Sequence, residues 1–271
     1  MQRKEFLRIA TPVFLLLANG NIIKSFGQPN DYRRRKPRIR FAIASDIHYR
    51  ENNTSYDEFL KTAIEKINLT HKKKPFDFCV LNGDIIHNDS KFYAAAKPII
   101  EKLNMKWYVT QGNHDMVTPE LWVAVWGIPV NFDFRLKDTA FIAGTTSNEK
   151  GKYICPNLGW FQEKLSKHQS AKNIFIINHI NTAKLTRHAI DCPDYIALLK
   201  KHKNVRAVLN GHDHDEDAIK MHQEIPFVFD AHVGGSWGTA YRGFRVVELH
   251  KDNSIITYIM NPDVQINNAT L

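Results

Sequence analysis

The stretch Lys106-Trp-Tyr-Val-Thr110 is followed, after Gln111, by Gly112-Asn113-His114-Asp115, so that an apolar run leads into a polar turn. The run predicts a buried strand, and Thr118-Pro119 predicts a helix start with Thr at the N-cap. Asn113, His114 and Asp115 are therefore expected on a loop at a strand end, where open α/β sheets carry their chemistry. Alone, the turn says little, because Gly, Asn and Asp are ordinary turn residues.

Four other apolar runs end in the same manner, each in a turn that contains Asp, Asn or His. These turns are Ser45-Asp46-Ile47-His48 after Arg40–Ala44, Asn82-Gly83-Asp84 after Phe76–Leu81, Asn178-His179 after Asn173–Ile177, and Asn210-Gly211-His212-Asp213-His214 after Val205–Leu209. In a parallel sheet such strand ends fall along one edge. We therefore expect these polar side chains to converge on one site.

The order of the elements predicts an α/β domain over residues 38–271. The chain has 271 residues and is 43% hydrophobic, enough for one large domain with a buried core. A capping box at Ser55-x-x-Glu58 predicts a helix that ends before Pro75, and a second helix is expected over Phe92–Leu103. Strands that alternate with these helices imply parallel pairing. The runs Asn131–Leu136 and Thr139–Gly144 predict a hairpin, and the region beyond Ile219 is rich in strand-like runs.

The positive charge lies mostly at the N-terminus. The formal net charge is +9, but residues 1–40 hold ten Lys or Arg residues and only two acidic residues. The rest of the chain is therefore nearly neutral. A groove that follows a nucleic-acid backbone is not expected.

The sequence pattern predicts an export signal over residues 1–27 and a basic linker over residues 28–37. Arg3, Lys4 and Arg8 precede the apolar stretch Ile9–Ala18, which is too short to span a bilayer. A frayed amphipathic tail is the alternative. Export predicts a periplasmic or secreted protein with no transmembrane span in its mature domain. Whether Cys155 and Cys192 pair stays open at this point.

Seven side chains at the strand ends offer oxygen or imidazole ligands and no sulfur. They are Asp46, His48, Asp84, Asn113, His179, His212 and His214. Seven ligands are too many for one closed tetrahedral zinc site but suit two adjacent ions that share a carboxylate. Asp84 is the expected bridge. This donor set suits Mn, Fe or Zn.

The ordered motifs resemble those of the calcineurin-like metallophosphoesterase superfamily over about residues 38–250. They are Asp46-x-His48, Gly83-Asp84, Gly112-Asn113-His114-Asp115, His179 and Gly211-His212-x-His214. No single motif is specific, but the ordered set is. The resemblance implies a four-layer α-β-β-α sandwich of two mixed sheets flanked by helices.

The resemblance also implies roles for these residues. One metal ion would be held by Asp46, His48, Asp84 and His214, and the other by Asp84, Asn113, His179 and His212. His114 would be the catalytic histidine, and Asp115 the acid that orients it. Two divalent ions would lower the pKa of a shared water and supply a bridging hydroxide as the nucleophile. His114 would then protonate the leaving oxygen.

Two positions depart from relatives in the superfamily. Many members have Pro two residues after the fourth-motif His, where this chain has Asn181. Purple acid phosphatases have a ligating Tyr three residues after the bridging Asp, where this chain has His87. His87 could contact substrate or cap its loop. In the glycine-rich segment that follows residue 233, Trp237 or Tyr241 could flank a leaving group or anchor a turn.

The motifs predict a dinuclear-metal phosphohydrolase with a small phosphoester substrate. Asp-x-His together with Gly-Asn-His-Asp resembles the class III cyclic-nucleotide phosphodiesterases and favours a phosphodiester. An export signal argues against a cytosolic messenger as substrate. A phosphomonoesterase on the same site is the main alternative. A non-catalytic metal-binding scaffold is disfavoured, because His114 and all seven ligands are present. The natural substrate, metal pair, oligomeric state and signal cleavage site stay open.

Overall fold

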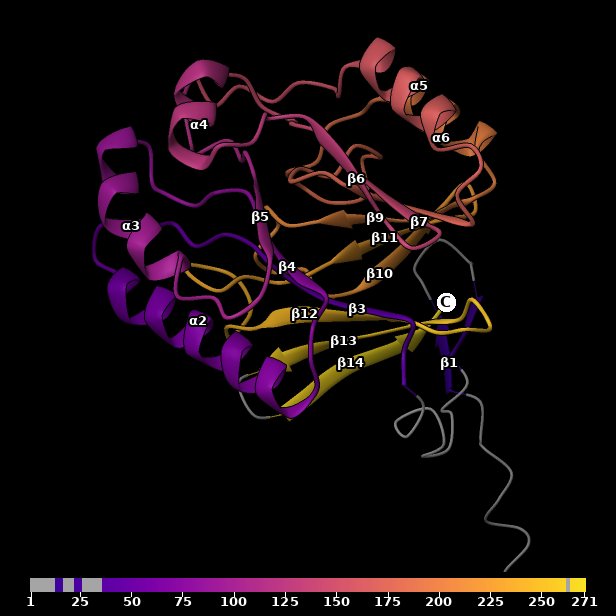
Figure 1. Cartoon of the computed structure of the whole chain (residues 1–271), viewed down its shortest axis with the longest axis horizontal. Coiled ribbons are helices and arrows are strands. Elements are labelled where there is room, and N and C mark those ends of the chain that lie inside the picture. The colour runs from indigo at the N-terminus through magenta and orange to yellow at the C-terminus, as the bar shows by residue number, and fades with distance from the viewer. Residues whose placement is uncertain (1–12, 17–21, 26–35, 262–263) are drawn as a thin grey trace, which may run out of the picture.

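Two six-stranded mixed sheets form the centre of the molecule, with helices on the outer face of each (Figure 1). The computed structural model describes residues 13–16, 22–25, 36–261 and 264–271. The helices α2 (Tyr56–Lys73), α3 (Tyr93–Ile100) and α4 (Pro119–Trp126) pack against one sheet, whereas α5 (Leu158–Lys167) and α6 (Pro193–Lys201) pack against the other. The expected four-layer α-β-β-α sandwich is confirmed.

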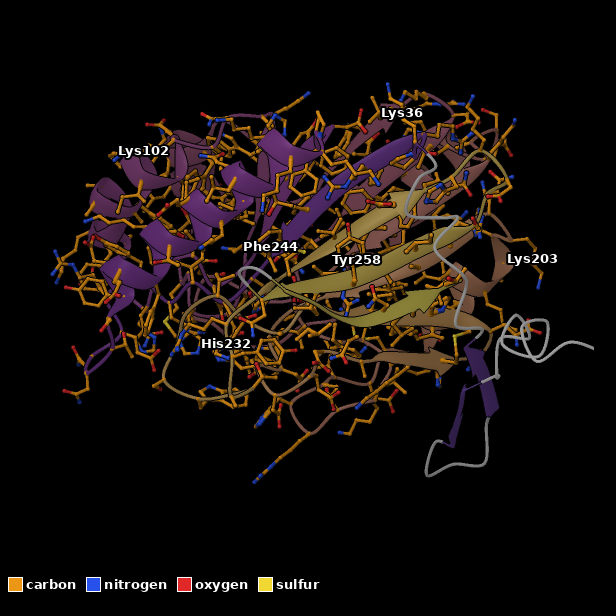
Figure 2. All side chains as sticks on the ribbon, turned by 90° about the horizontal axis from the view of Figure 1, so that it is seen from below. Lys36, Lys102, Lys203, His232, Phe244 and Tyr258 are labelled. Carbon is orange, nitrogen blue, oxygen red and sulfur yellow. A yellow bond between two sulfur atoms is a disulfide. The ribbon has the colours of Figure 1, made fainter. Side chains whose placement is uncertain are left out.

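The first sheet combines three parallel strands with three antiparallel ones, in the order β14-β13-β12-β3-β4-β5. Its strands are β3 (Ile39–Ala44), β4 (Phe78–Asn82), β5 (Trp107–Thr110), β12 (Phe244–Leu249), β13 (Ile255–Asn261) and β14 (Val264–Thr270). The C-terminal strands β12–β14 extend the parallel half on its β3 side. Figure 2 shows them beside α2, with Phe244 and Tyr258 labelled.

The second sheet has the order β10-β11-β9-β8-β7-β6. Its strands are β6 (Phe132–Leu136), β7 (Thr139–Ala143), β8 (Asn173–Ile177), β9 (Val205–Asn210), β10 (Ile219–His222) and β11 (Ile225–Phe229). The four central strands are parallel, and β6 and β10 are antiparallel edges. The predicted hairpin is confirmed as β6–β7.

The alternation of side chains along β3 shows how the layers form. All six residues of β3 are buried. Ile39, Phe41 and Ile43 face the core between the sheets, while Ala42 and Ala44 face the helices. Phe41 stacks on Phe78 at a centroid distance of 4.9 Å and meets Phe141 of the other sheet at 5.4 Å. Aromatic packing between the sheets therefore holds the strand ends of both in one place.

Helix α2 lies where its apolar spacing predicts. Leu60, Ile64 and Ile67 are buried at helical intervals. The predicted capping box is wrong, however, because the Ser55 side chain makes no cap hydrogen bond. Acidic side chains in the first turn and basic side chains in the last turn still stabilise the helix through their interaction with its dipole. The predicted cap of α4 is confirmed, because Thr118 accepts a hydrogen bond from Leu121 N.

The helix predicted over Phe92–Leu103 is shorter in the structure. A 3₁₀ turn over Ser90–Phe92 precedes α3, which ends at Ile100. Pro98 lies inside α3 near its end and has no N–H to continue the hydrogen-bond ladder. The change moves no site residue.

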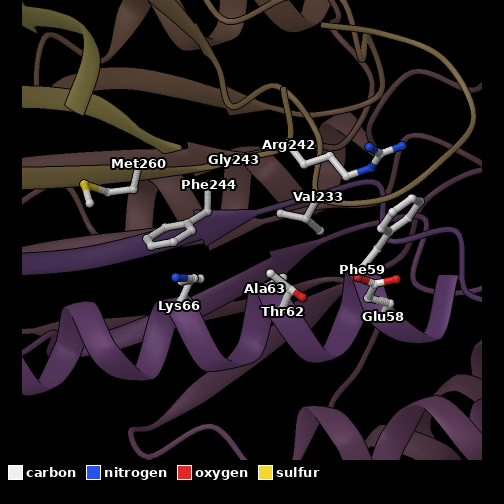
Figure 3. A pocket seen from close by; sticks show the side chains of 10 residues that line it. All are labelled: Glu58, Phe59, Thr62, Ala63, Lys66, Val233, Arg242, Gly243, Phe244 and Met260. Atoms are coloured by element: carbon white, nitrogen blue, oxygen red, sulfur yellow. The ribbon is translucent and has the colours of Figure 1, made fainter. Parts of the chain in front are cut away.

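A pocket of about 180 Å³ lies between α2 and the start of β12 (Figure 3). Phe59 and Lys66 of α2 face Arg242 and Phe244 across it. It contains none of the residues expected at the site. In the part of the chain that the structure describes, no helix is long and apolar enough to cross a membrane.

The predicted export signal and linker fall largely outside the described residues. Within residues 1–27 the structure describes β1 (Val13–Leu16) and β2 (Ile22–Ser25), which pair as a separate two-stranded sheet. The signal and the linker therefore stay predictions.

Candidate functional site

The five polar turns converge, but from two sheets rather than from one parallel edge. β3, β4 and β5 belong to the first sheet, and β8 and β9 belong to the second. Hydrogen bonds join the turns across this boundary. His212 N donates to Asp46 Oδ2 at 2.9 Å, and His179 Nδ1 donates to Asn82 O at 2.7 Å. The carboxyl ends of both parallel halves therefore form one site.

Four expected ligands have left-handed backbone conformations. The φ angles are 59° at Asp46, 47° at His48, 52° at Asp84 and 68° at His212. Non-glycine residues seldom adopt such angles, and the strain persists only where surrounding structure imposes it. Here it turns four side chains into a common space directly after their strands.

Gly83 allows two of the motifs to approach each other closely. A Cβ atom at this position would lie 2.4 Å from His179 Nδ1, and its φ angle of +81° also favours glycine. The Gly-Asp motif therefore needs its glycine for contact with His179 as well as for the turn.

Two groups combine a carboxylate with imidazoles, and within each group the ligand atoms lie within 4.8 Å of one another, as they also do in a third group of the imidazoles of His48, His87 and His114. The first consists of Asp46, His48 and His214, and the second consists of Asp84, His179 and His212. In the first, His214 Nε2 lies 3.1 Å from both Asp46 Oδ1 and His48 Nε2.

Asp84 lies between the two groups. Its Oδ2 atom is 3.2 Å from His179 Nε2 and 3.4 Å from His48 Nε2. Its other oxygen, Oδ1, accepts a hydrogen bond from His114 N at 2.8 Å. The carboxylate is thus held at one oxygen and faces both groups with the other, as a bridging ligand requires.

Several ligand atoms are buried without a hydrogen bond. Among the described residues these atoms include Asp84 Oδ2, Asn113 Oδ1, His179 Nε2 and His212 Nε2. Buried polar atoms that lack a partner are costly and need an explanation. Their convergence, their oxygen and nitrogen chemistry and the absence of sulfur among them fit a pair of metal ions.

Hydrogen bonds fix the direction of two imidazoles. His179 Nδ1 donates to Asn82 O at 2.7 Å, and His214 Nδ1 donates to Trp237 O at 3.2 Å. Because a carbonyl oxygen can only accept, Nδ1 carries the proton in both rings. The Nε2 lone pairs are then free to face a metal ion.

The electrostatics of the cluster favour positive charge at its centre. Burial would lower the pKa of His179, but the carboxylates of Asp84 and Asp46 raise this pKa to about 10. Burial lowers the pKa of His48 to about 3 and that of His212 to about 4. Two anions thus attract positive charge to the centre, whereas the imidazoles of His48 and His212 stay neutral, which is the state in which imidazole binds metal.

His114 lies beside these groups, but its orientation does not come from Asp115. The Asp115 carboxylate accepts hydrogen bonds from Ile85 N, Ile86 N, Gly112 N and the Tyr93 hydroxyl. His114 Nδ1 instead faces Asn88 Oδ1 at 2.7 Å. The structure therefore corrects the role expected for Asp115. This fully buried carboxylate holds the loop together through these hydrogen bonds. Its burial, and to a smaller extent the negative charge of Asp84, raise the pKa of Asp115 to about 7.

Two of the three residues expected on the substrate side lie at the site, and the third does not. His87 is at the site: its Nδ1 lies 3.1 Å from His48 Nδ1, and its ring stacks on His114 at 4.8 Å. Trp237 is also at the site and stacks on His214 at 4.4 Å. Tyr241 turns away, because its hydroxyl donates to Asp217.

A family comparison matches this geometry. The family model described as calcineurin-like phosphoesterase matches residues 39–216, about two thirds of the chain. The chain belongs to this family. A calcineurin-like phosphoesterase is a metal-dependent phosphoric ester hydrolase that uses two metal ions, and the two ligand groups are the candidate positions for them.

Three similar proteins place the phosphoesterase among its relatives. A probable cyclic nucleotide phosphodiesterase from Coxiella burnetii is 24% identical over 203 residues, which cover 69% of this chain and 80% of the relative. A dimetal phosphatase structure from Danio rerio has a TM-score of 0.69 at 12% identity and covers 86% of this chain and 98% of its own. A purple acid phosphatase structure from yellow lupin seeds has a TM-score of 0.66 at 14% identity and covers 95% of this chain and 58% of its own. The two structures support the fold alone.

Some site residues of the phosphoesterase were not foreseen from the sequence. His232 is buried, and its ring stacks on that of His214 at a centroid distance of 5.1 Å. Asn88 contacts His114, while Tyr153 and His188 both meet His212 edge-on. Only His232 carried a usable signal, because Asp230-Ala-His232 follows the apolar run of β11 in the manner of the five motifs.

Proposed function

We propose that this chain is an exported phosphodiesterase that uses two metal ions and acts on small phosphodiesters. Asp46, His48, Asp84 and His214 would hold one ion, and Asp84, Asn113, His179 and His212 would hold the other. The observation that carries the proposal is the convergence of buried, unpartnered ligand atoms on both sides of Asp84. Manganese, iron or zinc suits these donors.

The metal ions would supply two things: a water molecule of lowered pKa and positive charge for the phosphoryl oxygens. The protein positions the acid. Asn88 Oδ1 accepts the Nδ1 proton of His114, so the protonated ring would carry its second proton on Nε2 and pass that proton to the leaving oxygen. His87 stacks on the same ring and limits its rotation.

The charge around the ligands favours a diester over a monoester. Burial opposes ionisation of Asp46 and Asp84, but neighbouring imidazoles, chiefly His214 and His179, lower the pKa of both carboxylates. Their principal electrostatic partners are thus imidazoles rather than Arg or Lys. A phosphomonoester carries up to two negative charges and a diester only one, so ligand groups whose charged partners are chiefly imidazoles suit the diester. The relative named as a probable cyclic nucleotide phosphodiesterase supports the same choice.

Export is supported by the Cys155–Cys192 disulfide, whose cysteines are 37 residues apart in sequence. Disulfides persist in oxidising compartments and are rare in the cytosol. The basic, apolar N-terminus agrees with a periplasmic or secreted location.

The test is hydrolysis by the full chain, stripped with EDTA and restored with Mn²⁺. Bis-p-nitrophenyl phosphate is compared with p-nitrophenyl phosphate, and His114→Asn serves as the matched variant. We expect metal-dependent cleavage that favours the diester. His114→Asn should retain its metal and lose a factor of about 10² to 10⁴ in kcat, the usual contribution of a general acid.

The outcomes separate the alternatives. A preference for the monoester would make the chain a phosphatase on the same site. Binding of two metal ions without turnover of either ester would refute the phosphodiesterase. A His114→Asn protein with wild-type turnover would refute the role of His114 as the general acid.

A further inference from the structure

The loops around the ligand groups expose several large apolar side chains. Eight large hydrophobic side chains are exposed among the described residues. Four of them, Met116, Tyr153, Ile154 and Trp237, lie on segments that border the ligands. Apolar groups gathered beside a polar site are typical of a surface that binds an organic ligand.

Trp237 and Tyr153 lie directly on metal-ligand imidazoles. The Trp237 indole is nearly parallel to the His214 ring, with an interplanar angle of 8°, and the side chain is 44% exposed. Since one face of the indole rests on His214, a ligand that stacks on Trp237 would use the opposite face. Tyr153 meets His212 at 89° and 5.0 Å and is 39% exposed.

His188 contacts both Trp237 and the imidazole on which Tyr153 lies. Its ring lies 5.6 Å from Trp237 and 6.2 Å from His212, edge-on to both. Tyr153, His188 and Trp237, which we call the aromatic rim, therefore surround His212 and His214 from three different loops.

Specific ties hold the rim in place. The Cys155–Cys192 disulfide joins the loop that carries Tyr153 to the loop that carries His188. The second loop is also anchored to the ligand turn, because the Thr186 hydroxyl donates to Asp213 Oδ2 at 2.8 Å. Asp213 is buried between the two ligating histidines.

The third loop is tied to the ligands as well. The Trp237 carbonyl accepts from His214 Nδ1, and Thr239 N donates to His214 O at 3.0 Å. Gly235 lies so close that a Cβ atom there would be 2.7 Å from the His214 ring. A rim fixed before the substrate arrives binds a flat group without first losing conformational freedom.

We propose that the aromatic rim of Tyr153, His188 and Trp237 binds a planar aromatic or heteroaromatic group of the phosphoester substrate, with the Cys155–Cys192 disulfide positioning two of its three loops. This inference rests on the proposed function and adds the class of organic group that the site selects. Trp237 supplies the stacking face, and Tyr153 and His188 supply edges around it.

The experiment compares two ligands that share a phosphonate group and differ in the organic group. Phenylphosphonate and methylphosphonate are titrated as inhibitors of the Mn²⁺-loaded full chain, and their affinities are also measured by calorimetry. We expect phenylphosphonate to bind about tenfold more tightly, as stacking on one aromatic side chain gives. Trp237→Ala should reduce this ratio to about twofold, and Trp237→Phe should restore most of it.

Two further variants sharpen the test. Leu69→Ala removes an equally exposed apolar side chain on α2 and should leave the ratio unchanged. The double variant Cys155→Ser and Cys192→Ser should lower the ratio, because the loops of Tyr153 and His188 lose their link.

The failures of the two proposals can be told apart. If neither phosphonate binds and no ester is cleaved, the proposed function fails. If both bind equally well to the wild type, or if Trp237→Ala keeps the full ratio, the aromatic rim is overturned while the phosphodiesterase stands. A Trp237→Ala variant that weakens both ligands equally would also overturn the rim, because the indole would then act only through His214.

Discussion

Replacement of Glu248 by Gln should destabilise the fold without touching the site. Glu248 is 3% exposed on β12 and lies beside Arg40 of β3, which is 4% exposed. Arg40 Nε donates to Glu248 Oε1 at 2.8 Å, and Lys74 Nζ donates to both carboxylate oxygens at 2.8 and 2.9 Å. The neutral amide of the Glu248→Gln variant would leave the buried guanidinium without its anion.

The expected loss is about 3 kcal/mol, near the lower end of the cost of breaking a buried ion pair. The lower end applies because Arg40 keeps other partners. It donates to Lys74 O and to the Tyr258 hydroxyl, and its guanidinium lies 4.1 Å from the centre of the Phe76 ring. Urea unfolding should show the midpoint reduced by about 1 M with an unchanged slope.

The pH dependence gives a second signature. Burial would raise the pKa of Glu248, but Lys74 and Arg40 bring it below its ordinary value of 4.5. His250 Nε2, 3.7 Å from Glu248 Oε2, adds positive charge when protonated. A carboxylate with a lowered pKa stabilises the fold fully above pH 4.5 and loses this effect as the pH falls further. The difference in free energy of unfolding between wild type and Glu248→Gln should therefore become smaller as the pH falls below 4.5.

The control removes the ion pair as a unit. Arg40→Met combined with Glu248→Leu leaves neither charge unpaired and should cost less than Glu248→Gln alone. If the free energy of unfolding of Glu248→Gln lies within about 0.5 kcal/mol of the wild-type value, which is the range of ordinary surface substitutions, the buried ion pair does not stabilise the fold as argued.

Three further predictions concern the disulfide, the metal bridge and the acid. Replacement of Cys155 and Cys192 by Ser should cost about 4 kcal/mol in urea unfolding, from the 37-residue separation, and a reductant should abolish the difference from wild type. Asp84→Asn should lose metal and turnover together, because both ligand groups face this carboxylate. Elemental analysis of the variant measures the loss, and two retained metal ions would contradict the bridging role of Asp84. Asn88→Ala should lower kcat at least tenfold with little change in KM, and Asn88→Asp should recover activity because it can accept the same His114 proton. Equal losses in both Asn88 variants would exclude a positioning role.

The strands and the convergence of their polar ends were accessible from the sequence because both rest on local signals. An apolar run that ends in Gly, Asn, Asp or His marks a strand end, and each of the seven expected ligands lies within a few residues of one. The motifs do not tell which sheet each strand joins. β8 and β9 lie in the second sheet because the β6–β7 hairpin starts a new one.

What the sequence did not predict depends on contacts between distant segments. Ser55 has the right residue type for a cap, yet no cap hydrogen bond forms. Asp115 follows His114 directly, but its carboxylate points to the backbone after β4, and Asn88 reaches the imidazole instead. Neighbours in sequence need not be partners in space. Tyr153 carried no signal, because its place beside His212 follows from loop packing and a disulfide.

The phosphoesterase thus combines two kinds of construction with different tolerance to change. Its candidate metal ligands directly follow strands whose hydrogen bonds and buried aromatic core fix them, so a substitution there should remove metal and chemistry together. The aromatic rim stands on longer loops and is partly exposed, so a substitution such as Trp237→Ala removes stacking surface while the core stays intact. A chain of this design can change the organic group it accepts without rebuilding the centre that attacks phosphorus. The residues that decide the substrate should then be sought beside the ties that hold the loops, at Cys155–Cys192, Thr186–Asp213 and His214–Trp237, rather than within the motifs.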